Sequence, residues 1–187
     1  MRISKDPEVR KQEMIDTAMK LFSQKGYEAT SMTDIAREMN VVSGLCYRYF
    51  RSKEELYRVA MHQYAMESAA PMICIMSNEY NSVEECISGI QENFRSTDKR
   101  EKYHDFYHKE ENEIFHHQLE CEMLKILTPY VVKLVERINE AKHLNISNCE
   151  ATAQFILYGE MPILNNDSYE TDEKIRLVSE LMGKVLR

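Results

Sequence analysis

The sequence contains no tryptophan and only 5 glycines and 4 prolines among its 187 residues. Glycine and proline are the residues that most often interrupt helices, so their scarcity favours a chain built from helices. Hydrophobic residues make up 43% of the chain and charged residues 29%, which excludes a disordered or low-complexity composition. A chain of this length can form one large domain, or a small domain joined to a medium one.

Long apolar runs are also missing. No stretch approaches the roughly 18 apolar residues that a transmembrane helix needs, and the N-terminal segment Met1–Pro7 lacks the apolar region of a secretory signal. The 5 cysteines are odd in number and contain no CxxC pair, which favours reduced thiols that act as small hydrophobic residues. We therefore expect a cytoplasmic protein without a membrane segment.

The net charge of −7 argues against a protein that coats nucleic acid indiscriminately. Residues 1–60 carry 11 Lys and Arg against 9 Asp and Glu, whereas residues 61–187 carry 13 against 22. This distribution places a slightly basic segment before an acidic one, so any polyanion is expected to meet the N-terminal part.

Helical patterns fill most of the chain. Asp6 suits an N-cap, Pro7 the first helical position and Gly26 the position after the last turn. The predicted helices cover residues 7–25, 32–39, 43–50, 52–68, 72–79, 82–95, 99–112, 114–141, 147–158 and 171–186. We expect Pro71 to end or kink the fourth helix, Pro129 to bend or divide the long helix, and a loop over residues 162–169.

The first three helices fit the helix-turn-helix plan. This plan needs a small residue where the second helix packs closely, and Ala36 meets that need. It also needs a sharp turn, for which Asn40 tolerates a left-handed backbone, followed by a core residue, Val41. The third helix is short enough to enter the major groove, which is about 12 Å wide.

Two runs, Gly26–Ala36 (GYEATSMTDIA) and Ser43–Leu56 (SGLCYRYFRSKEEL), resemble the TetR family of bacterial transcriptional regulators. The resemblance covers residues 1–60. It implies phosphate binding at Ser31, where the second helix begins, and a base or backbone contact for Thr33. It also implies a backbone contact for Lys53 at the start of the fourth helix.

The same resemblance identifies the third helix as the recognition helix. Its leading end, which faces base edges, consists of Ser43, Gly44 and Leu45. Phosphate contacts are implied for Tyr47 and Tyr49, and a phosphate or guanine contact for Arg48. The sequence departs from the family pattern at five positions. The family usually has Gly in place of Asn40, Ser or Thr in place of Val42, and Lys, Arg or a similar long side chain in place of Ser43. It usually has Thr in place of Leu45 and Leu in place of Cys46. We expect the missing hydroxyl at Val42 to shift the helix cap to Ser43, and Leu45 to read a thymine methyl group.

A single recognition helix makes few base contacts, so operator binding calls for a two-fold dimer with recognition helices about 34–36 Å apart. The resemblance implies a four-helix interface made by two C-terminal helices from each subunit. The candidate helices are 144–158 and 171–186. Their candidate interface residues are Ala151, Ala153, Phe155, Ile156, Ile175, Val178, Leu181, Met182 and Val185.

The resemblance also implies a pocket for a small-molecule effector between the middle helices. Its candidate lining residues are aromatic or Met: Phe94, Tyr103, Phe106, Tyr107, Met123, Tyr130 and Tyr158. For each of them, plain core packing is the alternative. His104 with His108, and His117 with Cys121, have the i, i+4 spacing of metal ligands, but a solvated face with incidental histidines explains them equally, and we assign no metal and no cofactor.

We therefore expect an all-α chain with two domains: a three-helix N-terminal helix-turn-helix DNA-binding domain, residues 1–51, and a C-terminal helical ligand-binding and dimerisation domain, residues 52–187. The expected partners are double-stranded operator DNA, an unidentified small-molecule effector and a second copy of the chain. The sequence has no phosphate loop, G-x-S-x-G elbow or HExxH motif, so an enzyme is not expected. The other alternative is a non-specific architectural DNA-binding protein, which the acidic C-terminal part disfavours.

Overall fold

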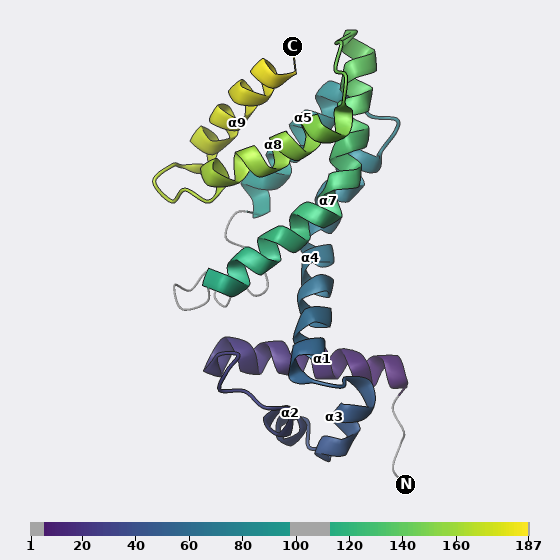
Figure 1. Cartoon of the computed structure of the whole chain (residues 1–187), viewed down its shortest axis with the longest axis vertical. Helices are drawn as coiled ribbons and strands as arrows, with labels where there is room; N and C mark the ends of the chain where they lie inside the picture. Colours follow the sequence, from purple (N-terminus) through teal and green to yellow (C-terminus); the bar gives the residue numbers. More distant parts are fainter. Residues whose placement is uncertain (1–5, 98–112, 187) are drawn as a thin grey trace. The chain divides into compact units, whose positions relative to one another are not determined.

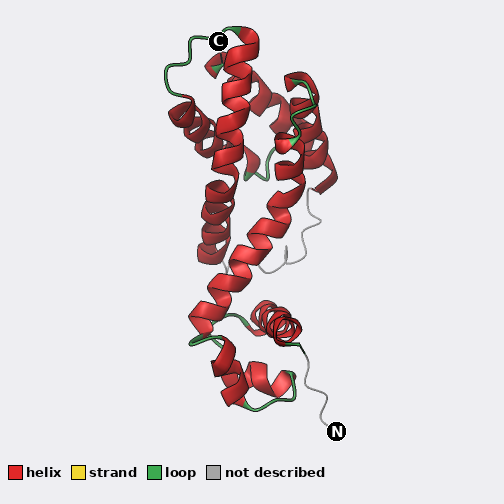
Figure 2. Ribbon diagram, turned by 90° about the vertical axis from the view of Figure 1, so that its right-hand side faces the viewer, coloured by secondary structure: helices red, strands yellow, loops and turns green. Residues whose placement is uncertain are grey.

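The computed structural model describes residues 6–97 and 113–186, and these residues form helices joined by loops, without a strand (Figures 1 and 2). The helices are α1 (Pro7–Lys25), α2 (Met32–Glu38), α3 (Ser43–Tyr49), α4 (Lys53–Ser77), α5 (Val83–Thr97), α7 (Glu113–Lys142), α8 (Cys149–Leu164) and α9 (Thr171–Val185). The predicted all-α fold class is confirmed. No helix in the described ranges combines the length and the apolar character needed to cross a membrane.

The chain divides into two compact units. Unit 1 comprises Met1–Ala65 with Lys102–Leu119, and unit 2 comprises Met66–Glu101 with Glu120–Arg187. Helices α4 and α7 therefore each contribute residues to both units. The domain boundary between residues 51 and 52 stays a prediction.

Local signals explain the ends of α1. The Asp6 carboxylate accepts a 2.9 Å hydrogen bond from the backbone N–H of Glu8 and caps the helix, as predicted. Gly26 follows the last turn with φ 85°, and its N–H donates to the Phe22 carbonyl at 2.9 Å. The predicted bounds of this helix are confirmed.

The core of unit 1 is formed by the inner faces of α1 to α4. Met14, Ala18 and Phe22 of α1 are completely buried, at spacings of four residues. These spacings place them on one face of the helix. Other fully or almost fully buried side chains of this core include Met19, Ile35, Ala36, Cys46, Phe50 and Leu56. This packing holds α2 and α3 in a fixed geometry.

Two predicted helix ends are wrong, whereas a kink at Pro71 stays a prediction. Helix α4 continues through Pro71 to Ser77, and α8 continues through Pro162 to Leu164, so the loop begins at Asn165. A proline inside a helix removes one backbone hydrogen bond. After Pro71, the burial of Met76 and the partial burial of neighbouring apolar residues against the core of unit 2 compensate for that loss. Helix α7 is likewise one element of 30 residues that contains Pro129.

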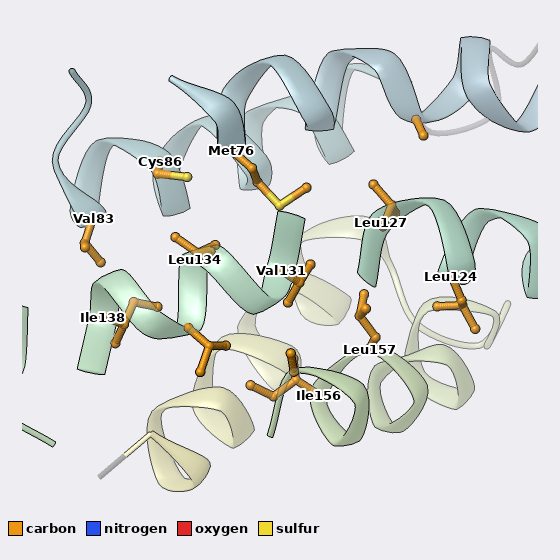
Figure 3. Packing of buried hydrophobic residues seen from close by; sticks show 13 residues of the cluster. Met76, Val83, Cys86, Leu124, Leu127, Val131, Leu134, Ile138, Ile156 and Leu157 are labelled. Atoms are coloured by element: carbon orange, nitrogen blue, oxygen red, sulfur yellow. The ribbon is translucent and has the colours of Figure 1, made fainter. Parts of the chain in front are cut away.

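Unit 2 has its own core, contributed by α4, α5, α7 and α8 (Figure 3). Figure 3 shows Leu124, Leu127 and Val131 of α7 beside Ile156 and Leu157 of α8. Polar contacts brace the same unit. The Arg95 guanidinium of α5 lies 2.8 Å from the Asp172 carboxylate of α9.

The turn between α4 and α5 is held by Arg137 of α7. Its guanidinium donates to the backbone carbonyls of Met76, at 3.5 Å, and Asn81, at 2.5 Å. The side chain is half-buried. It satisfies the Met76 carbonyl, which lies in the last turn of α4 and has no helical partner, and the Asn81 carbonyl in the turn that follows.

Candidate nucleic-acid interface

Helices α2 and α3 are joined by a tight turn. Asn40 has φ 53°, and its N–H donates to the Arg37 carbonyl at 3.0 Å, while the Val41 N–H donates to the Ala36 carbonyl at 2.9 Å. This pair of bonds is a Schellman motif, which normally places glycine at the left-handed position. Asparagine takes that position here, so the predicted left-handed turn is confirmed.

Helix α3 is seven residues long and has one buried side and one open side. Cys46 and Phe50 point into the core of unit 1, whereas Gly44, Tyr47 and Arg48 are exposed. Burial raises the pKa of the Cys46 thiol above its ordinary value, so this thiol is a core group and not a reactive thiolate. The exposed side therefore presents an aromatic hydroxyl and a guanidinium to solvent.

The N-cap of α3 is Val42, and within the described residues no side chain makes a capping hydrogen bond there. The expected shift of the cap to Ser43 is therefore wrong. Val42 has 73% of its surface exposed. Sequence reasoning identified the loss of the hydroxyl but not the consequence, which is an exposed apolar side chain at the leading end of α3.

Gly44 lies in the first turn of α3 with its Cα facing open space. A Cβ built at this position would meet no other heavy atom of the described chain within 4 Å, and the backbone is not in the left-handed region. Packing inside unit 1 therefore does not require glycine here. Glycine lowers helix stability by up to about 1 kcal/mol relative to alanine. Since the fold does not require glycine here, the missing side chain is better explained by a molecule that comes close to the backbone of α3.

Ser31 caps α2 in a capping box with Asp34. The Ser31 hydroxyl accepts the Asp34 N–H at 3.1 Å, and the Asp34 carboxylate accepts the Ser31 N–H at 3.0 Å and the Ser31 hydroxyl proton. The hydrogen bonds from Ser31 hold the pKa of Asp34 below its ordinary value. The Ser31 hydroxyl is thus engaged within the chain, beside a negative charge. The Ser-x-x-Asp spacing is the signal that would have identified this pair.

Lys53 is also engaged within unit 1. Its Nζ donates to the Tyr27 carbonyl at 2.8 Å and lies 4.1 Å from the centre of the Tyr27 ring. This ring packs against Phe22, Tyr57 and Phe115, with ring centres 5.1–5.3 Å from its own. The hydrogen bond and the cation–π contact hold the ammonium group at the start of α4. No local signal indicates this pairing, because 26 residues separate the two positions.

The structure brings the predicted DNA-contact residues together on α2, α3 and the first turn of α4. The exposed members are Ser31, Thr33, Gly44, Tyr47 and Arg48. The half-buried members are Ser43, Leu45, Tyr49 and Lys53. Their combined roles in DNA binding stay predictions.

The predicted effector residues that the structure describes, Phe94, Met123, Tyr130 and Tyr158, lie in unit 2. Tyr103, Phe106 and Tyr107 lie outside the described residues. Phe94, Met123 and Tyr130 are half-buried, whereas Tyr158 is exposed. An open surface hollow of about 490 Å³ is lined by Lys125, Thr128, Gln154 and Tyr158. Of the predicted lining residues that the structure describes, Tyr158 alone contributes to this hollow.

The structure describes one of the two candidate metal-ligand pairs. His104 and His108 lie outside the described residues, while His117 and Cys121 lie on α7. Among the side chains that the structure describes, no three His, Cys, Asp or Glu residues converge as metal ligands would.

The candidate interface residues on α8 and α9 separate into two sets. Ala153, Ile156 and Ile175 are buried in unit 2, and Val178 and Met182 are half-buried. The exposed set comprises Ala151, Phe155, Leu181 and Val185, with Phe155 67% and Leu181 47% exposed. Helices α8 and α9 pack against each other (Figure 1).

Residues 14–60 match the family model of "Bacterial regulatory proteins, tetR family". The chain is 47% identical over 51 residues to the HTH-type transcriptional regulator YuxN of Bacillus subtilis, a match over 27% of this chain and 18% of that protein. It is 42% identical over 48 residues, 26% of each chain, to the biofilm operon icaADBC HTH-type negative transcriptional regulator IcaR of Staphylococcus epidermidis. The sequence matches therefore span about a quarter or less of these relatives.

The fold is shared along almost the whole chain. The structure of the fatty acid degradation regulator FadR from Bacillus halodurans superposes with a TM-score of 0.64, covering 98% of this chain and 96% of that one at 19% sequence identity. At this identity the likeness concerns the fold alone.

Proposed function

We propose that this chain, which belongs to the tetR family of bacterial regulatory proteins through its N-terminal domain, is a ligand-responsive transcriptional repressor. The observation that carries the proposal is the solvent-exposed side of α3. Gly44, Tyr47 and Arg48 lie exposed on this side, directly after the Schellman turn that joins α2 to α3. A short helix with this composition fits the major groove.

The DNA contacts follow from side-chain chemistry. Arg48 donates to phosphate or to guanine, and the Tyr47 hydroxyl donates to phosphate. Gly44 lets the helix backbone approach the DNA closely, and Leu45 contacts a thymine methyl group. The Lys53 ammonium group, which the Tyr27 carbonyl holds in place, adds a positive charge near the DNA phosphate backbone.

Two copies of the chain bind one palindromic operator. Helix α8 supports this proposal because it is apolar on opposite faces. Ala153, Ile156 and Leu157 face the core of unit 2, while Ala151 and Phe155 are exposed. A helix that is apolar on both sides is normally buried on both sides. A second copy that covers Phe155 and the exposed residues of α9 satisfies this requirement.

Binding of a small-molecule effector to unit 2 favours a dimer whose two recognition helices no longer match the operator spacing, and the DNA is released. This mechanism requires only that the effector bind one arrangement of the dimer more tightly than the other.

The experiment that tests DNA recognition is selection of bound sequences from a random duplex library at near-physiological salt. A regulator enriches one palindrome with half-sites about one helical turn apart. A non-specific architectural protein enriches no sequence and loses its DNA to excess random competitor. Tyr47→Ala should weaken binding to the selected duplex, whereas Tyr80→Ala, which alters a fully exposed tyrosine of unit 2, should not.

The dimer is tested by analytical ultracentrifugation. Phe155→Asp should convert the dimer to a monomer, because it places a charge in an apolar contact. Tyr80→Asp is the matched control and should leave the dimer intact. A Phe155→Asp variant that sediments as the wild type would exclude this face as the interface.

A further inference from the structure

The position of the Lys53 ammonium group depends on Tyr27. Its Nζ donates to the Tyr27 carbonyl at 2.8 Å and lies 4.1 Å from the centre of the Tyr27 ring. An ammonium group carries three N–H donors, so these two contacts leave Lys53 able to bind a phosphate as well. The direction in which the charge is presented is therefore set by the carbonyl and the ring of Tyr27.

Tyr27 lies in the loop between α1 and α2, outside any helix. Its carbonyl also accepts the Thr30 N–H at 3.2 Å, which fixes the backbone of the turn. The ring is held by other aromatic side chains. Its centre lies 5.2 Å from that of Phe22, 5.1 Å from that of Tyr57 and 5.3 Å from that of Phe115. The orientation of the Tyr27 ring therefore depends on α1, α4 and α7.

Phe115 differs from the other two rings in its surroundings. Phe22 and Tyr57 are buried in the core of unit 1, whereas Phe115 is half-buried and lies in the first turn of α7, in the segment that belongs to unit 1. It contacts both tyrosines, with ring planes inclined by 55° to Tyr27 and by 65° to Tyr57. Aromatic rings prefer inclined packing of this kind. A helix without any predicted DNA contact thus supplies one of the rings that hold Tyr27.

We propose that Phe115 is a positioning residue for DNA binding: its ring holds the Tyr27 ring in the orientation that presents the Lys53 ammonium group to a DNA phosphate. This inference rests on the proposed function, which assigns the phosphate contact to Lys53. Without the Phe115 ring, Tyr27 is held less firmly and Lys53 becomes ordered only when DNA binds. Ordering a long side chain on binding lowers affinity. The loss is the same for every DNA sequence, because phosphate contacts carry no base information.

The test is a double-mutant cycle on the full chain, with affinity for the selected duplex measured by fluorescence anisotropy. The variants are Phe115→Leu, Lys53→Met and the combination of both. Phe115→Leu should weaken binding by about twofold to tenfold when Lys53 is present, the range expected for ordering one long side chain. In the Lys53→Met background the same change should have no effect, because the charge that Phe115 positions is gone. A merely structural role would weaken binding by the same factor in both backgrounds.

Salt dependence measures the Lys53 contact by itself. Loss of one phosphate contact reduces the slope of log affinity against log salt concentration by about 0.9. Between about 50 and 200 mM salt, Lys53→Met should therefore lose about 3.5-fold less affinity than the wild type. A duplex of scrambled sequence provides the second comparison, in which Phe115→Leu should weaken binding by the same factor as on the selected duplex.

Matched variants separate the ring from the rest of the side chain. Phe115→Tyr keeps an aromatic ring and should keep the affinity, whereas Phe115→Met removes the ring and should behave as Phe115→Leu does. Ile114→Ala alters the preceding residue of α7, whose side chain is 73% exposed, and should leave DNA binding unchanged. Circular dichroism shows that each variant is folded at the temperature of the binding assay.

Several results would overturn the inference: equal losses in both backgrounds of the cycle, full affinity in the folded variants without a ring, or a loss that depends on the DNA sequence. An unchanged salt slope in Lys53→Met would overturn it as well, since Lys53 would then make no contact to be positioned. Failure of the proposed function is distinguishable, because it appears with the wild type alone, as the absence of an enriched sequence in the selection experiment. The cycle and the salt slopes can then still be measured on a duplex of arbitrary sequence.

Discussion

Replacement of Gly44 by alanine separates the needs of folding from the needs of DNA binding. The added methyl group meets no heavy atom of the described chain within 4 Å and requires no left-handed backbone. Alanine is favoured over glycine in a helix by up to about 1 kcal/mol. We therefore expect Gly44→Ala to stabilise the free protein by about 0.5–1 kcal/mol, which corresponds to a rise in Tm of about 2–4 °C at most for a chain of this size.

The same methyl group should weaken DNA binding. It projects from the exposed side of α3, where the neighbouring exposed side chains are Tyr47 and Arg48. If DNA approaches the backbone at Gly44, the methyl group pushes the helix outward and lengthens these contacts. Loss of one good base contact costs about 1–3 kcal/mol, so affinity for the selected duplex should fall by about tenfold or more.

The assays are thermal unfolding followed by circular dichroism and fluorescence anisotropy with a labelled duplex from the selection. Ser88→Ala is the control, since Ser88 is exposed in α5, outside α3 and outside the proposed dimer interface, and alanine has the higher helix propensity. It should stabilise the protein without changing DNA affinity. A lower Tm for Gly44→Ala would show that glycine serves the fold, and an unchanged affinity would show that DNA does not approach α3 at this residue.

Three further predictions concern unit 2 and the start of α4. Arg137→Met should lower the free energy of unfolding in urea by about 1–3 kcal/mol, because two backbone carbonyls lose their donor; Arg176→Met, at an exposed ion pair, should change it little, and equal effects would contradict the bracing role. Burial raises the pKa of Glu160 to about 7 from an ordinary 4.5. The ionised side chain therefore does not destabilise the folded protein below pH 4.5, destabilises it increasingly as the pH rises toward 7, and does so by a constant amount above pH 7. Glu160→Gln should raise Tm at pH 8 but not at pH 4, and a change of Tm that does not depend on pH would refute the raised pKa. Lys53→Met should lower Tm as well as DNA affinity, since the ammonium group binds the Tyr27 carbonyl; a loss of affinity at unchanged Tm would show that this bond contributes nothing to the fold.

The elements that could be predicted from the sequence are those that local interactions determine. Asp6, Pro7 and Gly26 mark the two ends of α1, because capping and backbone preferences act within a few residues. Asn40 marks the turn before α3 for the same reason. The pattern in residues 26–56 also predicts the bounds of α3 to within one residue, since this short segment carries most of its own packing signals.

Only the tertiary structure decided the remaining features, because they depend on residues that are distant in the sequence. Pro71 predicts a break, yet burial beyond it keeps α4 continuous. Both faces of α8 are apolar, so helical periodicity cannot tell that Ile156 faces the core while Phe155 faces solvent. Likewise, the hydrogen bond from Lys53 to the Tyr27 carbonyl and the desolvation of Glu160 arise from packing between elements. Such packing sets the local electrostatics, and the sequence pattern of a single helix does not predict it.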